Sequence, residues 1–473
     1  MLRLIDMIKF WCLALGAAYF TNALTLEKKD LPSVLEVPFE SGRFAGAHHH
    51  DRRGKRDHTV KLEFYGNDFF YANISVGNPP QKLKAQFSTL DDSSWVVVSD
   101  NKELAKPIEQ GILDGYNASA STSSRSVKTH ATVDGFDQDE VGNIDIMSDT
   151  MIVGDVKLEA IRFATLREKA AIGDTLGLGY GNGNSEFISV TQALVDAKAI
   201  QSPAFSMWME ENHDQTYIPG TILFGGVNKA KYVDKLHTLP VISLPDLSKL
   251  FRVNLTGLSV GTGSTTKSVS PDSFSIGAVF SSATDFIGFP KAITQDLFSQ
   301  LNVTMFYENG QPMFPCDKPP ENKMLAFHFG DVAFNFSLDP FIAEAPSTTD
   351  PKQHEEGYCY LSFLTIEPER SKELGGAIIG ANFLKLVYTV FDMKNDEVSL
   401  AQRCWEKAPD EIMEIRSGKD GVPDRTTREK DKANTADKPK KTDESTGSNL
   451  KSGNGLKAVI AAGTVLMVAL IWG

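Results

Sequence analysis

Two short stretches carry serines at places where a repeated strand-turn could do chemistry. The first, FSTLDD, begins at Phe87, and the second, FSSATD, begins at Phe280. In both, an apolar run leads into Phe-Ser-(Ser/Thr), and an Asp stands four residues after the serine. Because this strand-turn pattern occurs twice, the chain is predicted to contain two related halves.

The residue types in these turns limit the chemistry. Ser88 and Ser281 are neutral hydroxyls near neutral pH, and neither lies in the Gly-x-Ser-x-Gly turn that exposes a nucleophilic serine. Asp92 and Asp285 stand at matching offsets, so two related halves would place them symmetrically, as a pair of carboxyls that could share a proton. The alternative is that these acids, with Asp91, cap turns or face solvent.

Composition excludes some classes of function. The chain has 473 residues with a formal net charge of −13, and an acidic surface repels phosphate backbones, so we expect no nucleic acid partner. The 29 Phe, and the Gly and Pro that interrupt short β-branched runs, indicate a mostly β protein. No cofactor is expected, and His48-His49-His50 is interpreted as a flexible basic patch in preference to a metal site.

The N-terminal region is typical of a secreted protein. Residues 1–23 join early basic residues to a short apolar run and end in Ala23, which predicts a cleaved signal peptide; the alternative is a signal anchor. Residues 24–56 are polar and end in Arg53-Gly54-Lys55-Arg56, the form cut by secretory convertases. They are interpreted as a prosegment, the alternative being an exposed basic loop.

The C-terminal region indicates a membrane tether. Residues 458–473 are apolar and follow a small, polar stretch, which is the pattern of a GPI-attachment signal. The alternative is a short tail-anchored helix. Residues 405–457 are rich in charged and hydroxyl side chains, so they are predicted to form a disordered stalk. The expected location is the extracellular face of the plasma membrane.

A secreted chain makes sequons and cysteines informative. Of the three cysteines outside the signal peptide, Cys316 and Cys359 are predicted to form a disulfide and Cys404 to be left over, although other pairings remain open. Their spacing does not predict a zinc site. Asn335 lies within the apolar stretch VAFNFSL, where a sequon often stays unmodified. The candidate glycan sites are Asn73, Asn117, Asn254, Asn302 and Asn335.

Several further segments follow one another in a set order. They read YANISVGNPPQ, DTLGLGY, ILFGGVN and AIIGANFLKLVYTVFD. In this order the chain resembles a pepsin-like aspartic protease over nearly all of residues 57–402. The resemblance implies a mostly β fold with two pseudo-symmetric lobes, 57–232 and 233–404, and a central cleft. It also places Cys316 and Cys359 where the second lobe usually carries a disulfide.

The resemblance implies what the serine turns replace. In that family each lobe supplies an Asp-Thr-Gly turn, and the two carboxyls act together as general acid and general base. Here the turns read Ser88-Thr89-Leu90 and Ser281-Ser282-Ala283. General acid or base catalysis contributes about 10²–10⁴-fold, and both functions are predicted to be lost. Leu90 is expected to crowd the place where the two turns meet.

Two more positions depart from the family pattern. The first-lobe flap usually carries a tyrosine, and here Phe136 stands in the ring's place, with Asp137, Asp139 and Glu140 beside it. Ala381 occupies a position where the second lobe normally has an acid.

These observations predict a secreted or cell-surface homologue that binds a peptide or protein in its cleft and does not hydrolyse it. One alternative is an active endopeptidase that uses the displaced acids Asp92 and Asp285. The other is a surface adhesion or structural protein with a vestigial cleft.

Overall fold

The computed structural model describes most of the chain between residues 32 and 426. The described ranges are 32–42, 69–90, 92–101, 115–131, 144–167, 173–181, 186–210, 218–245, 247–262, 265–271, 274–306, 310–320, 323–344, 357–406 and 408–426. The chain divides into two units, Met1–Ser33 and Val34–Gly473. All the helices and strands described here lie in the second unit.

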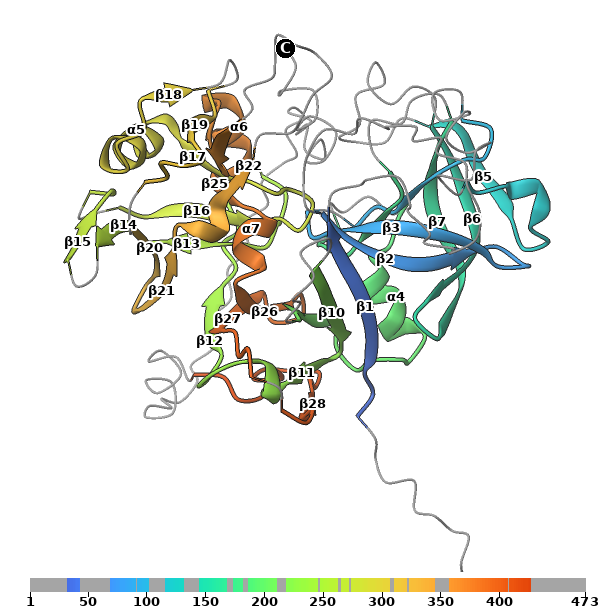
Figure 1. Ribbon diagram of the computed structural model, residues 1–473. Coiled ribbons are helices and arrows are strands. Elements are labelled where there is room, and N and C mark those ends of the chain that lie inside the picture. Colours follow the sequence, from blue (N-terminus) through green and yellow to red (C-terminus); the bar gives the residue numbers. More distant parts are fainter. Residues whose placement is uncertain are drawn as a thin grey trace, which may run out of the picture. The chain divides into compact units, whose positions relative to one another are not determined.

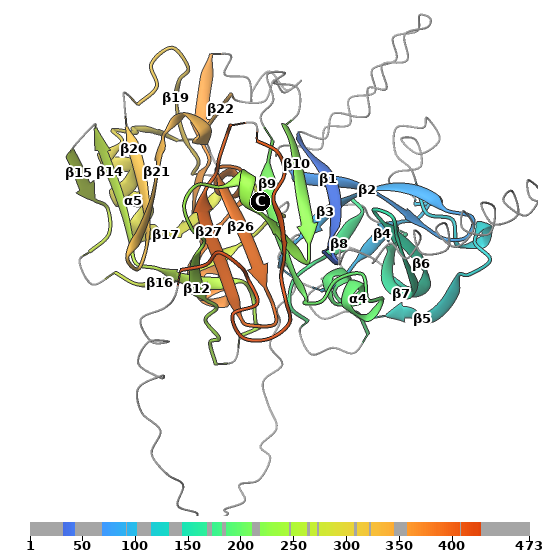
Figure 2. The same ribbon diagram turned by 90° about the horizontal axis from the view of Figure 1, so that it is seen from below.

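The largest sheet of the described chain has thirteen strands, and in it β1, β2 and β3 lie side by side (Figure 1). Two strands from late in the chain, β27 and β26, lie between β12 and β9 near one end of this sheet, and β26 pairs with β9 (Figure 2). The order is β12 (His237–Pro240), β27 (Glu397–Gln402), β26 (Val387–Asp392), β9 (Ala204–Met209), β10 (Ile218–Phe224), β1 (Leu35–Gly42), β2 (Phe69–Val76), β3 (Gln81–Ser88), β8 (Thr175–Gly177), β4 (Trp95–Val97), β7 (Val156–Leu166), β6 (Ile144–Val153) and β5 (Arg125–Ala131).

Four smaller sheets are built from later residues. The first has the order β13 (Arg252–Leu255), β16 (Ile276–Phe280), β25 (Gly376–Ile379), β17 (Ile287–Pro290) and β24 (Phe363–Ile366). The second is β15 (Thr265–Ser268), β14 (Gly257–Thr262), β20 (Met324–Phe329) and β21 (Val332–Ser337). The others are β18 (Met305–Phe306), β19 (Pro312–Pro315), β23 (Tyr358–Leu361) and β22 (Ile342–Glu344), and the pair β11 (Gly226–Asn228) and β28 (Ile412–Glu414).

Helices are few and short in the described residues. In α5, Ile293 and Leu297 repeat at four-residue spacing and are buried, so one face of the helix packs on the protein. α6 begins at Pro368 and is capped by Gly375, whose φ of 71° is the left-handed conformation that glycine adopts easily. The helices are α4 (Val190–Asp196), α5 (Lys291–Gln300), α6 (Pro368–Leu374) and α7 (Ala381–Leu384), with 3₁₀ turns at Ala118–Ala120, Lys229–Lys231 and Asp339–Phe341.

Strand topology confirms the predicted pair of related halves. In the first half, β3 runs parallel to β8, β8 is antiparallel to β4, and β4 is parallel to β7. In the second half, β16 runs parallel to β25, β25 is antiparallel to β17, and β17 is parallel to β24. The same succession of pairings therefore surrounds both serine turns, and the mostly β, two-lobed expectation is confirmed.

The predicted prosegment, 24–56, contains a strand of the large sheet. β1 pairs with β10 over seven residues and with β2 over three. Its alternating apolar side chains Leu35, Val37 and Phe39 are buried in the main core. This alternation is the strand signal that the polar composition of the segment concealed. Cleavage after Arg56 stays a prediction, because residues 43–68 lie outside the described part of the chain.

The predicted disordered stalk, 405–457, begins too early. Residues 408–426, called the C-terminal strap here, are folded, and β28 pairs with β11 (Figure 1). Ile415 and Val422 are buried in a cluster with Tyr388 and Trp208, and the Thr426 N–H donates to the Leu236 carbonyl at 2.8 Å. A few apolar anchors and backbone hydrogen bonds thus fold a segment whose composition predicted disorder. Residues 427–473, including the predicted GPI signal, lie outside the described range.

Candidate functional site

The two serine turns occupy equivalent places in their halves. Ser88 ends β3 beside β8, and its carbonyl accepts the Leu178 N–H at 2.8 Å. Ser281 follows β16 beside β25, and its N–H donates to the Ile379 carbonyl at 2.9 Å. Each turn is therefore held by the apolar, glycine-bearing segment of its own half.

The residues after the two serines join the halves reciprocally. The Thr89 hydroxyl donates to the Phe280 carbonyl at 2.9 Å and accepts the Ser282 N–H at 3.0 Å. The Ser282 hydroxyl donates to the Phe87 carbonyl at 2.7 Å and accepts the Thr89 N–H at 3.1 Å. These four hydrogen bonds, called the interlock here, are fully buried, so each hydroxyl satisfies two backbone groups that water cannot reach.

The sequence contains a signal for the interlock. Both turns read Phe-Ser-(Ser/Thr), with a hydroxyl residue after the serine in each half. The reciprocal pairing joins positions 193 residues apart, so only the folded chain shows what those hydroxyls contact.

The serines themselves have no exposed surface. Ser88 and Ser281 are both 0% exposed. The Ser281 hydroxyl lies 2.8 Å from the Thr284 hydroxyl, and the Ser88 hydroxyl accepts the Leu90 N–H at 3.3 Å. A pair of neutral hydroxyls can exchange a hydrogen bond, but it holds no charge near neutral pH with which to activate water.

Asp92 and Asp285 occupy matching positions, and each packs within its own half. Both are buried. A Cβ atom at Gly177 would overlap the Asp92 backbone, and one at Gly380 would overlap the backbone between Thr284 and Phe286, so each half needs a glycine where this turn passes. The predicted symmetry of the two acids therefore holds at the level of the backbone.

The electrostatics of Asp92 are local. Burial raises the pKa of its carboxyl, while its own N–H and Ser93, whose hydroxyl donates to Oδ1 at 3.4 Å, act in the opposite direction. Asp285 is not among the groups that shift this pKa. The groups that act on the Asp92 carboxyl are thus those of its own turn. Asp91 lies outside the described residues.

The expected crowding at Leu90 is not observed. Leu90 is buried and belongs to an apolar cluster whose other members, Leu250, Val279, Phe286, Ile366, Leu374 and Ile378, all come from the second half. Ala283, its counterpart, is also buried. The prediction was wrong because it considered only the space between the two turns, whereas the neighbouring half provides an apolar pocket for the leucine.

The two other departures from the family pattern have different outcomes. Ala381 is buried at the start of α7, and its N–H donates to the Thr284 carbonyl at 2.5 Å. The second-half turn therefore contacts α7 through backbone, with only a methyl group where an acid was expected. Phe136 and its acidic neighbours lie outside the described residues.

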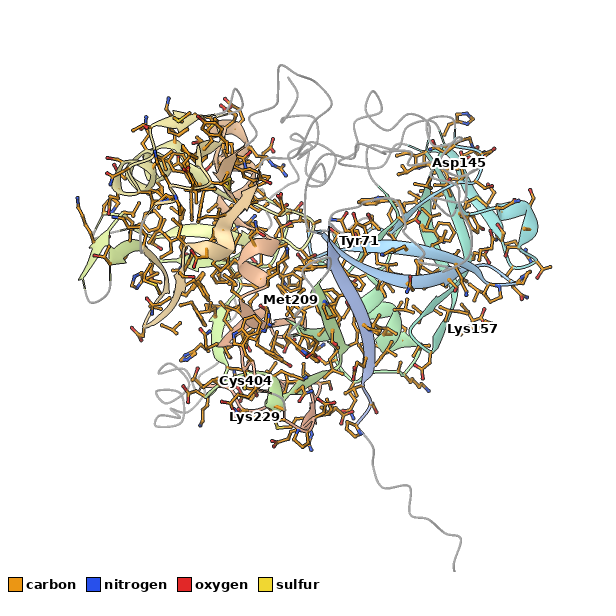
Figure 3. All side chains as sticks on the ribbon, in the orientation of Figure 1. Tyr71, Asp145, Lys157, Met209, Lys229 and Cys404 are labelled. Atoms are coloured by element: carbon orange, nitrogen blue, oxygen red, sulfur yellow. A yellow bond between two sulfur atoms is a disulfide. The ribbon has the colours of Figure 1, made fainter. Side chains whose placement is uncertain are left out.

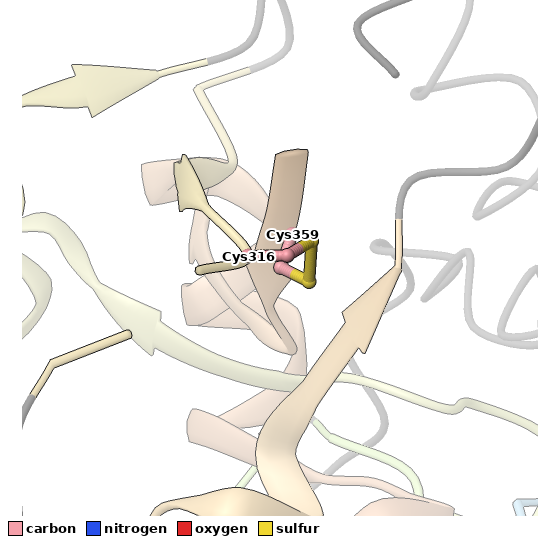
Figure 4. Close-up of a disulfide and its surroundings, with 2 residues drawn as sticks. All are labelled: Cys316 and Cys359. Carbon is pink, nitrogen blue, oxygen red and sulfur yellow. A yellow bond between two sulfur atoms is a disulfide. The ribbon is translucent and has the colours of Figure 1, made fainter. Parts of the chain in front are cut away.

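The predicted disulfide is present. Cys316 and Cys359 are bonded, with Cα atoms 5.0 Å apart, and link the end of β19 to β23 (Figure 4). The leftover Cys404 is free, as expected, and half-buried. The Cys404 N–H donates to the Lys231 carbonyl at 2.9 Å. Figure 3 labels Cys404 and the nearby Lys229.

All five sequon asparagines are exposed, which is the surface position that the sequons predicted. Asn117 caps a 3₁₀ turn, since its side chain accepts the Ser119 N–H at 3.0 Å. Asn335 is exposed although its strand is apolar. Modification itself stays a prediction.

The described ranges contain neither a metal-binding cluster nor a membrane-spanning helix. There, no group of three or more His, Cys, Asp or Glu side chains is placed to hold a metal ion. Within the same ranges, no helix has the length and hydropathy needed to cross a bilayer. His48–His50 and the apolar C-terminal tail lie outside them.

Comparison with known proteins agrees with this geometry. Residues 69–403 match the family described as "Eukaryotic aspartyl protease". The chain is 28% identical over 419 residues to "Probable aspartic-type endopeptidase opsB" of Aspergillus oryzae, covering 86% of this chain and 83% of that protein. It is 23% identical to "Aspartic proteinase yapsin-3" of Saccharomyces cerevisiae, covering 74% and 69%, and 23% identical to "Vacuolar protease A" of Aspergillus fumigatus, covering 73% and 81%. The chain therefore belongs to the eukaryotic aspartyl protease family.

Proposed function

We propose that this chain is a non-hydrolytic member of its family, which binds an extended peptide or protein segment and does not cut it. One observation carries the proposal: both central turns keep the interlock through Thr89 and Ser282, but present Ser88 and Ser281 where the family resemblance implies catalytic carboxyls. The halves remain held together while the charged groups are missing.

The chemistry of hydroxyls supports this reading. A general base must accept a proton near the working pH, and a serine hydroxyl does not do so without an adjacent base. Burial adds to the argument, because Ser88 and Ser281 have no exposed surface at which a water molecule could be activated. A fold with exposed strand edges can still bind an extended chain through backbone hydrogen bonds when its catalytic acids are absent.

We further propose that the protein acts at the outer surface of the cell. The supports are the signal-peptide pattern at 1–23, the five exposed sequons and the GPI-signal pattern at 458–473. The membrane is thus a proposed partner through the anchor, alongside a peptide or protein ligand.

The test is a cleavage assay on the full chain purified from a eukaryotic secretory host. Incubation with a denatured protein between pH 3 and pH 7 should give no cleavage above a no-protein control, and the denatured protein should be retained on the immobilised chain. The matched variant is Ser88→Asp with Ser281→Asp, which restores the two acids. Pepstatin-sensitive cleavage by the unmodified chain would overturn the proposal.

The second candidate is an active endopeptidase that uses displaced acids. It is favoured by the names of the relatives and by the symmetric, buried placement of Asp92 and Asp285. Asp92→Asn and Asp285→Asn separate the two candidates, because only the second predicts that either change removes an activity. Ser281→Ala is the control, since a mechanism based on the displaced acids should survive it.

A further inference from the structure

The edge strand β21 differs from the other strand edges of the described chain. It has six residues, Val332–Ser337, reading VAFNFS, with neither a charge nor a proline. Among the described strands, it pairs only with β20, along one side. Within the described residues, every other edge strand is four residues or shorter, except β5, which carries Arg125 and Lys128.

An edge of this kind normally needs protection. Exposed edge strands are templates for pairing with a second chain, and proteins block them with charges, prolines, bulges or short length. The opposite edge of the same sheet, β15, is four residues long and exposes Lys267. On β21 the charged residues, Asp331 and Asp339, stand outside the strand at its two ends, so its middle has no such protection.

The middle of β21 holds a sequon instead. Asn335 is exposed, while its neighbours Phe334 and Phe336 point inward, with ring centroids 6.5 and 5.7 Å from that of Phe383. The inward rings fix which face of the strand Asn335 occupies. On that face it stands opposite Ala326, and Ala333 lies two residues before it. Both neighbours are small, and Asn335 and Ala333 are exposed, so the Asn335 side chain is open to solvent.

We propose that Asn335 carries an N-linked oligosaccharide that covers the edge of β21 and prevents a second copy of this chain from pairing there. An incoming strand would lie about 4.8 Å away, with side chains about 4.5–5.5 Å from Asn335 on the same face. The first sugars would occupy that space. The proposal rests on secretion of the chain, and it is independent of whether the central turns catalyse anything.

The modification is a glycosyl transfer from a lipid-pyrophosphate-linked oligosaccharide, and the lipid pyrophosphate is the leaving group. The Asn335 amide nitrogen bonds to the anomeric carbon, the bond from that carbon to the pyrophosphate oxygen breaks, and one amide proton is lost. The Ser337 hydroxyl completes the sequon, and Ser337 is half-buried at the end of β21.

The test compares three variants of the mature protein as a eukaryotic secretory host delivers it. Glycopeptide mass spectrometry of the protein with its natural sequence should find a glycan on Asn335. Asn335→Gln and Ser337→Ala destroy the same sequon by changing two different residues. Both variants should associate as protein concentration rises, so that the measured particle mass reaches about twice the monomer mass or more. Asn335→Lys also lacks the sugar but places a charge on the edge, so it should remain monomeric.

Controls separate this effect from a general loss of glycan. Asn254→Gln removes the exposed sequon on β13 and should remain monomeric. Thermal unfolding of each variant verifies that it is folded. An unmodified Asn335 in the secreted chain would overturn the proposal. So would monomeric Asn335→Gln and Ser337→Ala proteins, or an Asn335→Lys protein that associates as they do.

Discussion

The turn after β3 reads Ser88-Thr89-Leu90, and the turn after β16 reads Ser281-Ser282-Ala283. At the second position the two are equivalent, because each hydroxyl donates to a carbonyl and accepts an N–H of the opposite half. Thr and Ser serve equally well there, since only the hydroxyl is used. At this position, neutral hydroxyls make the contacts between the halves, and no charged group takes part.

At the third position the two turns differ. Leu90 places an isobutyl group in an apolar cluster of the second half, whereas Ala283 contributes one methyl group. At this position the first half therefore reaches into the second, and among the described residues Ala283 belongs to no such apolar cluster. The interlock is symmetric, whereas the apolar packing beside it is one-sided, and substitutions in and beside the two turns should therefore differ in their effects.

The largest effect is expected from breaking the interlock. Thr89→Val keeps the shape of the side chain but leaves the Phe280 carbonyl and the Ser282 N–H without their partner. The free energy of unfolding should fall by about 2–6 kcal/mol, at about 1–3 kcal/mol for each buried group left unpaired. Chemical denaturation followed by intrinsic fluorescence measures it.

Ser282→Ala is the matched change in the other half and should cost a similar amount. Because the two hydroxyls share one network, the double variant should lose clearly less than the sum of the two single losses. Additive losses would show that the halves do not depend on each other here, and that the symmetric description is wrong.

The second effect tests the one-sided packing. Leu90→Ala should lower the free energy of unfolding by about 2–5 kcal/mol, the range for removing a buried leucine side chain. Ala283→Gly removes one methyl group and should cost about 1 kcal/mol or less. Thermal and denaturant unfolding of the two variants are the measurement, and equal losses would contradict the asymmetry.

The sequence predicted the parts of this comparison that depend on local pattern. Apolar runs, Gly and Pro marked β2, β3, β8 and β16, and the repeated Phe-Ser-(Ser/Thr) marked the two halves. The disulfide followed from the family resemblance and is present. Such signals survive in sequence because each is carried by neighbouring residues.

Contacts between distant segments could not be predicted in the same way. The pocket around Leu90 is made by residues as far apart as Leu250 and Ile378, so sequence alone suggested crowding. The C-terminal strap folds through a few anchors, such as Ile415 and Val422, within a largely polar segment. Average composition predicted disorder because it contains no information on which distant residues these few apolar side chains contact in the folded chain.

The third effect compares two adjacent serines in one turn. Ser281→Ala removes a hydroxyl that lies 2.8 Å from the Thr284 hydroxyl, and should cost about 0.5–1.5 kcal/mol, as for an ordinary hydrogen bond. Ser282→Ala, one residue later, should cost several times more because it breaks two bonds of the interlock. If the two alanine variants unfold at the same denaturant concentration, the first and second positions do not have the separate roles assigned to them.

The smallest effect concerns the acid of the first turn and appears as a pH dependence. Burial raises the pKa of Asp92 above its ordinary value of 3.8, so the folded state holds this proton more tightly than the unfolded state. The free energy of unfolding then falls as pH rises from that value through the folded pKa. Asp92→Asn has no proton to lose, so its stability relative to the unmodified chain should rise over the same interval.

Ser93→Ala provides the opposite control. It removes a hydroxyl that lowers the pKa of Asp92, so it should steepen the loss of stability with pH where Asp92→Asn abolishes it. Unfolding measured from pH 3 to pH 7 on the three proteins gives the three slopes. Parallel profiles would mean that Asp92 is not shifted in the folded chain, and the burial that separates this acid from an ordinary surface carboxylate would have to be reassigned.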